Sequence, residues 1–354
     1  MRIQLDYDLS TQNTFRMKVR CACYVEYETV KELEGLNFDR LPRPLLHIGE
    51  GSNLLFTGDF PGTVLHSNIE FIKYIDMGLE EVPVMVGAGV VWDHFVEEAC
   101  RHGLWGAENL SLIPGEVGAA AVQNIGAYGV EVKDIISGVV CFDLQERKKV
   151  KFSREECRYG YRDSLFKQPE AKGRYVITSV LFRLTRKHSP RLDYKGVREA
   201  LGIPGQAGND SAAAPNPVMA DLIGHLTPQQ VRDAIIRIRR QKLPDPEEIG
   251  SAGSFFKNPV VSREDFARIS PDGSAPHFDL PDGTVKVPAA WMIDQCGLKG
   301  ASEGGAAVYE KQPLVLVNAS GQASPQEVIA LEQRIINTVR ERFGVTLHPE
   351  VEHI

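Results

Sequence analysis

A glycine-rich loop is the first segment whose residue types point to chemistry. Gly49-Glu50-Gly51-Ser52-Asn53 follows a short apolar run, residues 45–48. Glycines let backbone N–H groups approach an anion closely, and Ser and Asn side chains add hydrogen bonds. The loop lacks the third glycine and the helix of a dinucleotide-binding fingerprint, and it lacks the Gly-Lys-Ser/Thr of a Walker loop. It therefore predicts either a phosphate-binding loop or a tight turn.

A second segment, residues 108–131, is rich in small side chains. Its sequence is ENLSLIPGEVGAAAVQNIGAYGVE. Glycine destabilises a packed helix or strand by up to about 1 kcal/mol relative to alanine. That cost is explained if the backbone must lie flat against a planar ligand. The alternative is a glycine-rich loop that allows a helix to pack closely.

Further motifs follow these two segments in a fixed order along almost the whole chain. They are Asn13-Thr14-Phe15, Tyr161-Arg162-Asp163-Ser164, Lys242-Leu243-Pro244-Asp245-Pro246, Gly253-Ser254-Phe255-Phe256-Lys257-Asn258-Pro259, Trp291-x-Ile293-Asp294-Gln295, Gln312-x-Leu314-Val315-Leu316-Val317-Asn318 and Pro349-Glu350-Val351. Together with the two glycine-rich segments, this series resembles the UDP-N-acetylenolpyruvoylglucosamine reductase (UDP-N-acetylmuramate dehydrogenase) family of peptidoglycan synthesis.

The resemblance implies a reaction and two cofactors. The family reduces the enolpyruvyl ether of its UDP-sugar to a lactyl ether, using NADPH and FAD. Hydride is added to the β-carbon of the double bond, which leaves negative charge on the α-carbon beside a carboxylate. The enzyme must stabilise that charge and deliver a proton.

The same resemblance implies three catalytic residues. Arg162 would hold the substrate carboxylate as a permanent cation. Glu350 would complete the electrostatic clamp on the developing enol, and Ser254 would donate the proton. Taken singly, these residues are equally consistent with a surface salt bridge, an acid near a helix and a loop hydroxyl.

Substrate and cofactor contacts are implied in the same way. For the UDP-sugar they are Tyr161, Tyr194, Lys242, Asn258 and Gln312. Tyr194 indicates the type I branch of the family, in which a loop tyrosine closes over the UDP group. For FAD they are Gly49, Glu50, Gly51, Ser52, Asn53, Pro114, Gly115, Gly118, Ala119, Asn124, Gly126, Ala127 and Tyr128. Non-covalent FAD is expected, because only His47 lies near the loop as a candidate for covalent attachment.

Composition excludes several other classes of protein. The 354 residues carry a net charge of −7, which argues against general nucleic-acid binding. No apolar run reaches the roughly 18 residues of a membrane span, and the N-terminus lacks the apolar core of a signal peptide. Six cysteines and nine histidines are scattered without metal-ligand spacing, so no bound metal is expected. We expect a cytoplasmic protein that is a monomer.

Apolar periodicity predicts the elements that position these residues. Strands are expected at 45–48, 54–56, 84–86, 139–144 and 175–184, and a helix around residues 95–100 that Gly103 ends. Two further helices begin at capping signals, Thr227-Pro228-Gln229-Gln230 and Ser324-Pro325-Gln326-Glu327. Each carries an apolar stripe that we expect to face a core. Residues 203–220 indicate a flexible insertion or linker.

The expected fold class is α+β. The resemblance implies a two-part FAD-binding domain of the vanillyl-alcohol-oxidase (PCMH) type and a C-terminal α+β substrate-binding domain. Expected boundaries are 1–70 and 71–190 for the two FAD-binding subdomains, 191–224 for a loop and linker, and 225–343 for the substrate domain. Residues 344–354 are expected to belong with the first subdomain, as a C-terminal segment that returns to the active site.

Two rival functions remain open at this point. One is another FAD-dependent oxidase or dehydrogenase of the same fold. The other is a relative that binds nucleotide sugars without catalysis, against which the presence of Ser254, Arg162 and Glu350 speaks.

Overall fold

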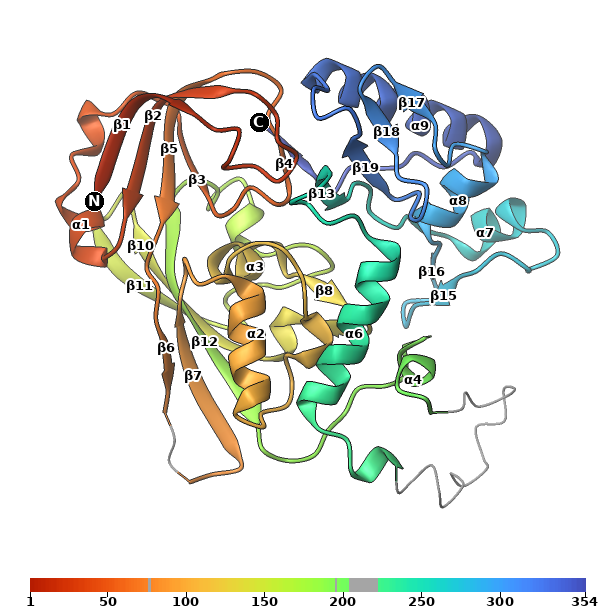
Figure 1. Cartoon of the computed structure of the whole chain (residues 1–354), viewed down its shortest axis with the longest axis horizontal. Coiled ribbons are helices and arrows are strands. Elements are labelled where there is room, and N and C mark those ends of the chain that lie inside the picture. Colours follow the sequence, from red (N-terminus) through yellow and green to blue (C-terminus); the bar gives the residue numbers. More distant parts are fainter. Residues whose placement is uncertain (76–77, 195, 204–221) are drawn as a thin grey trace. The chain divides into compact units, whose positions relative to one another are not determined.

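The computed structural model describes residues 1–75, 78–194, 196–203 and 222–354 (Figure 1). Contacts divide the chain into two compact units. Unit 1 comprises Met1–Leu5, Ala22–Glu50 and Pro61–Gln241, and unit 2 comprises Asp6–Cys21, Gly51–Phe60 and Lys242–Ile354. Apart from Ile203, the expected linker at 203–220 lies outside the described residues.

Unit 1 is built around two β-sheets, and most of the residues of these sheets belong to it. The first has the order β1-β2-β5-β3, with β1 Arg2–Asp8, β2 Arg20–Tyr27, β5 Phe60–Ser67 and β3 Leu45–Ile48. The second has the order β11-β10-β12-β7-β6, with β11 Lys148–Ser153, β10 Ile136–Asp143, β12 Tyr175–Thr185, β7 Glu81–Gly87 and β6 Ile72–Tyr74. Its neighbouring strands are antiparallel, whereas β3 and β5 are parallel. The sequence predicted four of these strands or their central residues, namely β3, β7, β10 and β12.

Helix α2 (Trp92–Arg101) and helix α3 (Val117–Gln123) cover one face of the second sheet (Figure 1). Helix α2 forms because its apolar residues recur every three or four positions, so that they line one face. Its Phe95 ring stacks on Phe182 of β12, with ring centroids 4.6 Å apart. Gly103, at φ +68°, then ends the helical segment, as predicted.

Helix α6 (Pro228–Lys242) also packs within unit 1. Its buried stripe of Val231, Ile235 and Ile238 joins a core cluster that contains Trp105 and Val197. The Thr227 hydroxyl caps the helix by accepting from the N–H of Gln230, as the capping signal predicted. Minor elements of unit 1 are α1 Val30–Gly35, η1 Phe38–Arg40, η2 Glu108–Leu110, β8 Gly126–Ala127, β9 Val130–Glu131, η3 Val132–Asp134, η4 Leu165–Lys167 and α4 Val197–Ala200.

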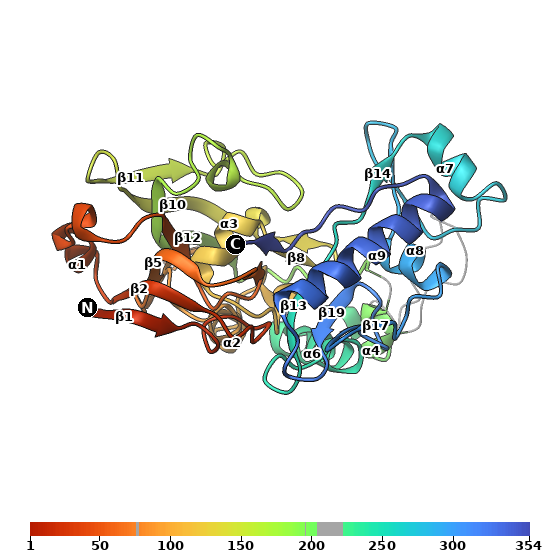
Figure 2. The same cartoon turned by 90° about the horizontal axis from the view of Figure 1, so that it is seen from above.

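Unit 2 is an α+β unit in which α9 (Pro325–Phe343) packs against a four-stranded sheet (Figure 2). The sheet order is β13-β19-β18-β17, with β13 Gly250–Ser254, β19 Val315–Asn318, β18 Ala306–Val308 and β17 Ser302–Glu303. The predicted capping box of Ser324 and Glu327 begins α9, and Gly344 at φ +71° ends it. The remaining elements are β4 Leu54–Leu55, β14 Val260–Val261, α7 Arg263–Ile269, β15 Phe278–Asp279, β16 Val285–Lys286, α8 Ala289–Gln295 and β20 Glu352–His353.

The division into units cuts across the expected domain boundaries, since residues 6–21 and 51–60 of the expected first subdomain lie in unit 2. Residues 225–241 lie in unit 1 rather than with the substrate domain, because the apolar stripe of α6 is buried there. Residues 344–354 also lie in unit 2, where β20 pairs in parallel with β4, a strand within residues 1–70. No helix in the described ranges combines the length and the apolar character needed to cross a membrane.

Candidate functional site

Within unit 1, Gly49 and Glu50 of the first glycine-rich segment lie beside the second segment. The side chain of Glu50 accepts a hydrogen bond from the N–H of Gly115 at 2.9 Å. A Cβ atom added to Gly49 would lie 3.3 Å from the Cβ of Ala119, so the loop and the start of α3 approach each other closely. Two segments that are 65 residues apart in the sequence therefore form one small-residue surface.

Close packing explains part of the small-residue bias in residues 108–131. The N–H of Gly118 donates to the Ala88 carbonyl at 2.9 Å, and a Cβ there would lie 3.0 Å from the Ala88 Cβ. Ala120 and Ala121 are buried in the same core. Close helix packing therefore explains why Gly118, Ala120 and Ala121 are small. Pro114 is exposed and Ala119 only half-buried, and these two small residues can face a ligand.

The hairpin after α3 is held by Arg162. The guanidinium donates to the carbonyl of Gly126 at 2.7 Å and to that of Asn124 at 3.3 Å. A Cβ on Gly126 would lie 2.8 Å from Nη1 of Arg162, so only glycine fits there without displacement. Arg162 itself has φ +53°, a strained conformation for a residue other than glycine. The structure thus brings together Arg162 and two of the residues assigned to the cofactor.

Asn124 uses its side chain within the protein. Its amide nitrogen donates to the Gly160 carbonyl at 2.7 Å, and its Oδ1 accepts from the N–H of Lys133 at 3.1 Å. The residue is fully buried and ends α3 in the left-handed conformation, at φ +46°. Its role in this geometry is to shape the turn into the hairpin.

Two tyrosines of the expected site meet in unit 1. The rings of Tyr128 and Tyr194 are 5.4 Å apart at an angle of 80°, an edge-to-face arrangement. Tyr128 has φ +48°, and its carbonyl accepts from the Asn109 side chain at 3.0 Å. Tyr194 is 45% exposed and Tyr161 is 39% exposed, so both offer their rings to a ligand. The ring of Tyr161 lies 5.4 Å from the guanidinium carbon of Arg162.

A buried imidazole–carboxylate pair beside the loop was not predicted. Nε2 of His66 lies 2.6 Å from the Glu116 carboxylate, and Nδ1 lies 2.8 Å from the Tyr24 hydroxyl. Burial raises the pKa of Glu116 to about 7, although the hydrogen bond with His66 opposes this rise. Burial is the largest single influence on His66 and disfavours its charged form, but the hydrogen bonds and negative charges of Glu116 and Glu26 together outweigh burial and raise the pKa of His66. Oε2 of Glu116 would lie 3.1 Å from a Cβ on Gly49, so the pair borders the loop.

His47 shows no sign of a covalent attachment role. Its Nε2 lies 2.7 Å from the Tyr27 hydroxyl in the interior of unit 1. Burial lowers the pKa of His47 to about 3, so the ring is neutral at physiological pH. These contacts give His47 a structural role in unit 1.

Ser254 and Glu350 lie close together in unit 2. Ser254 ends β13 and is exposed. The next residue, Phe255, accepts a hydrogen bond at its carbonyl from the N–H of Glu350, at 2.8 Å. An antiparallel bridge between Phe256 and Pro349 continues this pairing. The structure therefore places the expected proton donor and the expected acid on neighbouring segments of unit 2, while Arg162 belongs to unit 1.

The Asn13-Thr14-Phe15 motif supports this part of unit 2. The Asn13 side chain bridges the carbonyls of Leu9 and Met17, at 2.7 and 3.2 Å. The Thr14 hydroxyl donates to the Ser251 carbonyl of β13 at 2.7 Å, and Phe15 packs edge-to-face against Phe255. The motif therefore anchors the strand that carries Ser254.

Gly51, Ser52 and Asn53 belong to unit 2, whereas Gly49 and Glu50 belong to unit 1. Gly51 has φ +64°, and a Cβ on it would lie 2.3 Å from the Gln12 carbonyl. Glycine is therefore required at this position. The Asn53 side chain donates to the carbonyl of Glu350 at 3.1 Å.

The other expected substrate residues are placed separately in unit 2. Lys242 is the exposed last residue of α6. Asn258 caps α8, because its Oδ1 accepts from the N–H of Ala289 at 2.9 Å. Gln312 lies in the turn before β19, where its carbonyl accepts from the N–H of Val315 at 3.0 Å. No hydrogen bond joins these three side chains to one another among the described residues.

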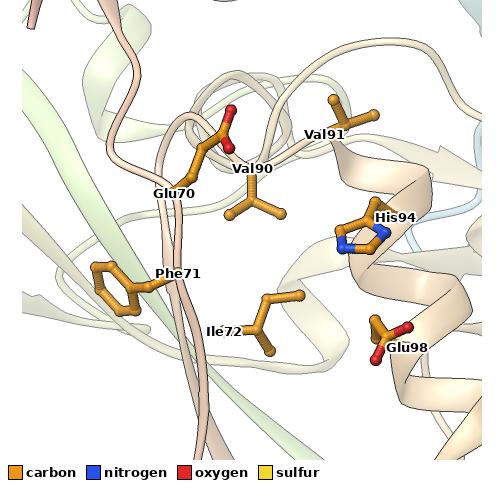
Figure 3. A pocket seen from close by; sticks show the side chains of 7 residues that line it. All are labelled: Glu70, Phe71, Ile72, Val90, Val91, His94 and Glu98. Atoms are coloured by element: carbon orange, nitrogen blue, oxygen red, sulfur yellow. The ribbon is translucent and has the colours of Figure 1, made fainter. Parts of the chain in front are cut away.

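A pocket of about 390 Å³ lies in unit 1, and none of the expected site residues lines it (Figure 3). Its walls combine apolar side chains with acidic groups and one imidazole, from Glu70, Phe71, Ile72, Val90, Val91, His94 and Glu98. Two carboxylates at its edge disfavour a diphosphate group. We therefore assign the pocket no part in holding the cofactor's phosphates.

The residues of unit 1 fit FAD. Half-buried Ala119, Gly126 and Ala127 leave backbone accessible to a flat ring system. The carboxylates nearest the loop are already engaged, that of Glu50 with the Gly115 N–H and that of Glu116 with His66. This engagement reduces their repulsion of a diphosphate.

Comparisons with known proteins agree with this geometry. A family model described as an FAD binding domain matches residues 29–145, and one described as the C-terminal domain of UDP-N-acetylenolpyruvoylglucosamine reductase matches residues 245–354. The UDP-N-acetylenolpyruvoylglucosamine reductase of Bacteroides fragilis is 47% identical over 98% of this chain and 99% of that protein. The reductase of Porphyromonas gingivalis is 44% identical over the whole of both chains. A crystal structure of the reductase (MurB) from Thermus caldophilus, 25% identical, covers 100% of this chain and 99% of its own, with a TM-score of 0.66.

The fold and the site define an FAD-dependent oxidoreductase of α+β architecture, as expected from the sequence. Identity above 40% over nearly the full length then fixes the family. The chain belongs to the UDP-N-acetylenolpyruvoylglucosamine reductase family.

Proposed function

We propose that this protein reduces UDP-N-acetylenolpyruvoylglucosamine to UDP-N-acetylmuramate in peptidoglycan synthesis, with NADPH as the electron donor. The observation that carries the proposal is the 47% identity to a reductase of that name over 98% of the chain. The pairing of the Ser254 strand with the Glu350 segment supports it. When bound, FAD supplies hydride transfer from NADPH to the β-carbon of the substrate's double bond.

Each of three side chains of this protein has a separate task in the proposed reaction. Arg162 binds the enolpyruvyl carboxylate, and its orientation is set by the carbonyls of Gly126 and Asn124. Glu350 polarises the substrate toward the enol form. Ser254, exposed at the end of β13, gives its proton to the α-carbon. A serine hydroxyl is a weak acid, but protonation of a carbanion-like centre is strongly downhill.

Substrate binding uses the remaining expected residues. Tyr194 and Tyr161 offer exposed rings, and Lys242 offers a mobile positive charge for the diphosphate. Asn258 has its Oδ1 engaged with Ala289, so its amide nitrogen is the group that would contact the nucleotide. Gln312 adds a polar contact. We further propose that the enzyme works in the cytoplasm as a monomer, which gel filtration can check.

Anaerobic stopped-flow spectroscopy tests the proposed function. The FAD-loaded protein is reduced with NADPH and mixed with UDP-N-acetylenolpyruvoylglucosamine, while flavin absorbance is followed. Fast reoxidation that is lost in Ser254→Ala is the expected result. Reoxidation by O₂ alone would identify an oxidase, and protein that takes up no FAD would identify a non-catalytic relative.

A further inference from the structure

The side chain of Asn53 holds the backbone around Glu350. Its Nδ2 donates to the Glu350 carbonyl at 3.1 Å, and its own carbonyl accepts from the N–H of Glu352 at 3.0 Å. Between these two contacts lies Val351, which is 3% exposed. One residue of the glycine-rich loop therefore holds the C-terminal segment at two backbone positions, Glu350 and Glu352.

The contact continues as a short parallel strand pair. Glu352 pairs with Leu54 and His353 with Leu55. The N–H of Ile354 donates to the Leu55 carbonyl at 3.0 Å. At the far end, Nε2 of His353 lies 2.8 Å from the Glu332 carboxylate of α9. Residues 350–354 are therefore held along their whole length by unit 2.

Glu350 is also held from its other side. Its N–H donates to the carbonyl of Phe255, which directly follows Ser254. The amide N–H of Glu350 is thus fixed by the Ser254 segment, and its carbonyl is fixed by Asn53. With both of its backbone polar groups engaged, Glu350 has a backbone that is held in place on two sides.

We propose that Asn53 is a positioning residue for Glu350, acting through its side-chain amide on the catalytic acid rather than on the cofactor. The inference rests on the proposed function, because it requires Glu350 to act on the substrate. It replaces the sequence-based expectation that the Asn53 side chain binds FAD. Catalytic groups must be held to a fraction of an ångström, and a misplacement of about 1 Å can cost about 100-fold in rate.

The test separates the two half-reactions in Asn53→Ala and Asn53→Asp. Aspartate keeps the shape of the side chain but has no N–H to donate to the Glu350 carbonyl. Asn337→Ala, an exposed asparagine on α9, is the matched control, and Glu350→Gln is the reference for loss of the acid. Flavin content, flavin reduction by NADPH and reoxidation by UDP-N-acetylenolpyruvoylglucosamine are measured for each.

We expect both Asn53 variants to retain FAD and to be reduced at the wild-type rate. Their limiting rate of reoxidation should fall by about 10- to 100-fold, with less than about a threefold change in half-saturating substrate. Amide hydrogen exchange of residues 350–354 should accelerate in both variants and stay unchanged in Asn337→Ala. This exchange readout reports the loosened segment independently of activity.

Two results would overturn the proposal, and they differ from each other. If the Asn53 variants bind FAD weakly but reoxidise at the wild-type rate once loaded, the side chain is a cofactor ligand and does not position Glu350. If Glu350→Gln itself reoxidises as fast as wild type, Glu350 is not catalytic, and the role given to it under the proposed function fails together with this inference.

Discussion

At the scale of single residues, the His66–Glu116 pair should make the stability of the protein depend on pH. The two side chains are 2.6 Å apart and buried, with Tyr24, Glu26, Glu50 and Glu70 as the other titratable groups acting on them. Both pKa values are raised in the folded protein, that of Glu116 to about 7. A proton is therefore held more tightly by the folded chain than by the unfolded one.

The sign of the resulting pH dependence follows from this shift. Groups with a raised pKa stabilise the folded state fully at low pH and lose that contribution as pH rises. For this pair the loss begins near pH 4.5, the ordinary value for glutamate, and continues through about pH 7 and above. We expect the free energy of unfolding to fall across this window more steeply in wild type than in the double variant His66→Gln/Glu116→Gln.

Urea unfolding at pH 5, 6, 7 and 8 measures this difference. One proton taken up by folding contributes up to about 1.4 kcal/mol per pH unit to the slope. His102→Gln, at an exposed histidine after α2, is a control that should keep the wild-type slope. Parallel curves for wild type and the double variant would show that the pair takes up no proton on folding.

A glycine in the loop gives a second prediction at this scale. Gly51→Ala should destabilise the protein, because it forces an alanine into φ +64° and sets its Cβ 2.3 Å from the Gln12 carbonyl. The left-handed conformation alone costs about 1–2 kcal/mol, and relief of the clash adds about 1–3 kcal/mol. Gly58→Ala is the matched control, since nothing lies within 4 Å of a Cβ there. Equal unfolding midpoints in urea for the two variants would contradict the prediction.

At the scale of elements, α6 is held in unit 1 by a bidentate ion pair as well as by its apolar stripe. The Arg232 guanidinium donates to both carboxylate oxygens of Asp93 on α2, at 2.6 and 2.9 Å. Asp93 also accepts from the N–H of Leu112, whose carbonyl accepts from Arg239 of α6 at 3.1 Å. Leu112 has φ +57°, so these contacts hold a strained turn within the second glycine-rich segment, just before α3.

Removing one partner of this pair should be costly. Arg232 is 5% exposed, and Arg232→Met would leave Asp93 without its charged partner. Such a loss typically costs about 3–5 kcal/mol, whereas replacing both partners costs less than the sum of the single changes. We therefore expect Asp93→Asn/Arg232→Met to be more stable than additivity predicts. Arg240→Met, at an exposed position of the same helix, should change the unfolding free energy by less than about 0.5 kcal/mol.

Periodicity predicted that α6 exists but not where it packs. A stripe of Val231, Ile235 and Ile238 shows that one face is buried, and it does not identify the partner face. Sequence order suggested the substrate domain, while the structure buries the stripe against Trp105 and Val197 in unit 1. The start and end of α9 were predictable, because its capping box and Gly344 act locally.

Contacts between distant residues account for what the sequence did not reveal in the site. Asn53 lies 297 residues from Glu350, and His66 lies 50 residues from Glu116. Neither pair has a local signal, because no propensity or spacing rule links residues so far apart. The motif series identified the segments that carry the candidate catalytic and binding residues. Only the structure shows that the side chains of Asn53 and Asn124 donate hydrogen bonds to backbone carbonyls of the protein.

At the scale of the whole molecule, the site residues fall into two groups by unit. Most of the expected FAD contacts belong to unit 1, whereas Lys242, Asn258 and Gln312 belong to unit 2. Different ligands should therefore protect different segments from amide hydrogen exchange. We expect FAD to slow exchange at residues 49–53 and 114–128, and UDP-N-acetylmuramate to slow it near 242, 258 and 312.

The factor by which FAD should slow amide hydrogen exchange follows from mass action. Ligand at about 100 times its dissociation constant stabilises the bound state by about 2.7 kcal/mol, so amides that exchange only when FAD leaves should slow by about 100-fold. Exchange is measured on flavin-free protein with and without FAD, and the exposed face of α9 serves as the internal control. Protection concentrated at residues 70–98 instead would move the cofactor to the pocket of Figure 3, whose acidic edge argues against a diphosphate. In that case the small residues of the glycine-rich segments would serve close packing, as Gly118 does where it contacts Ala88.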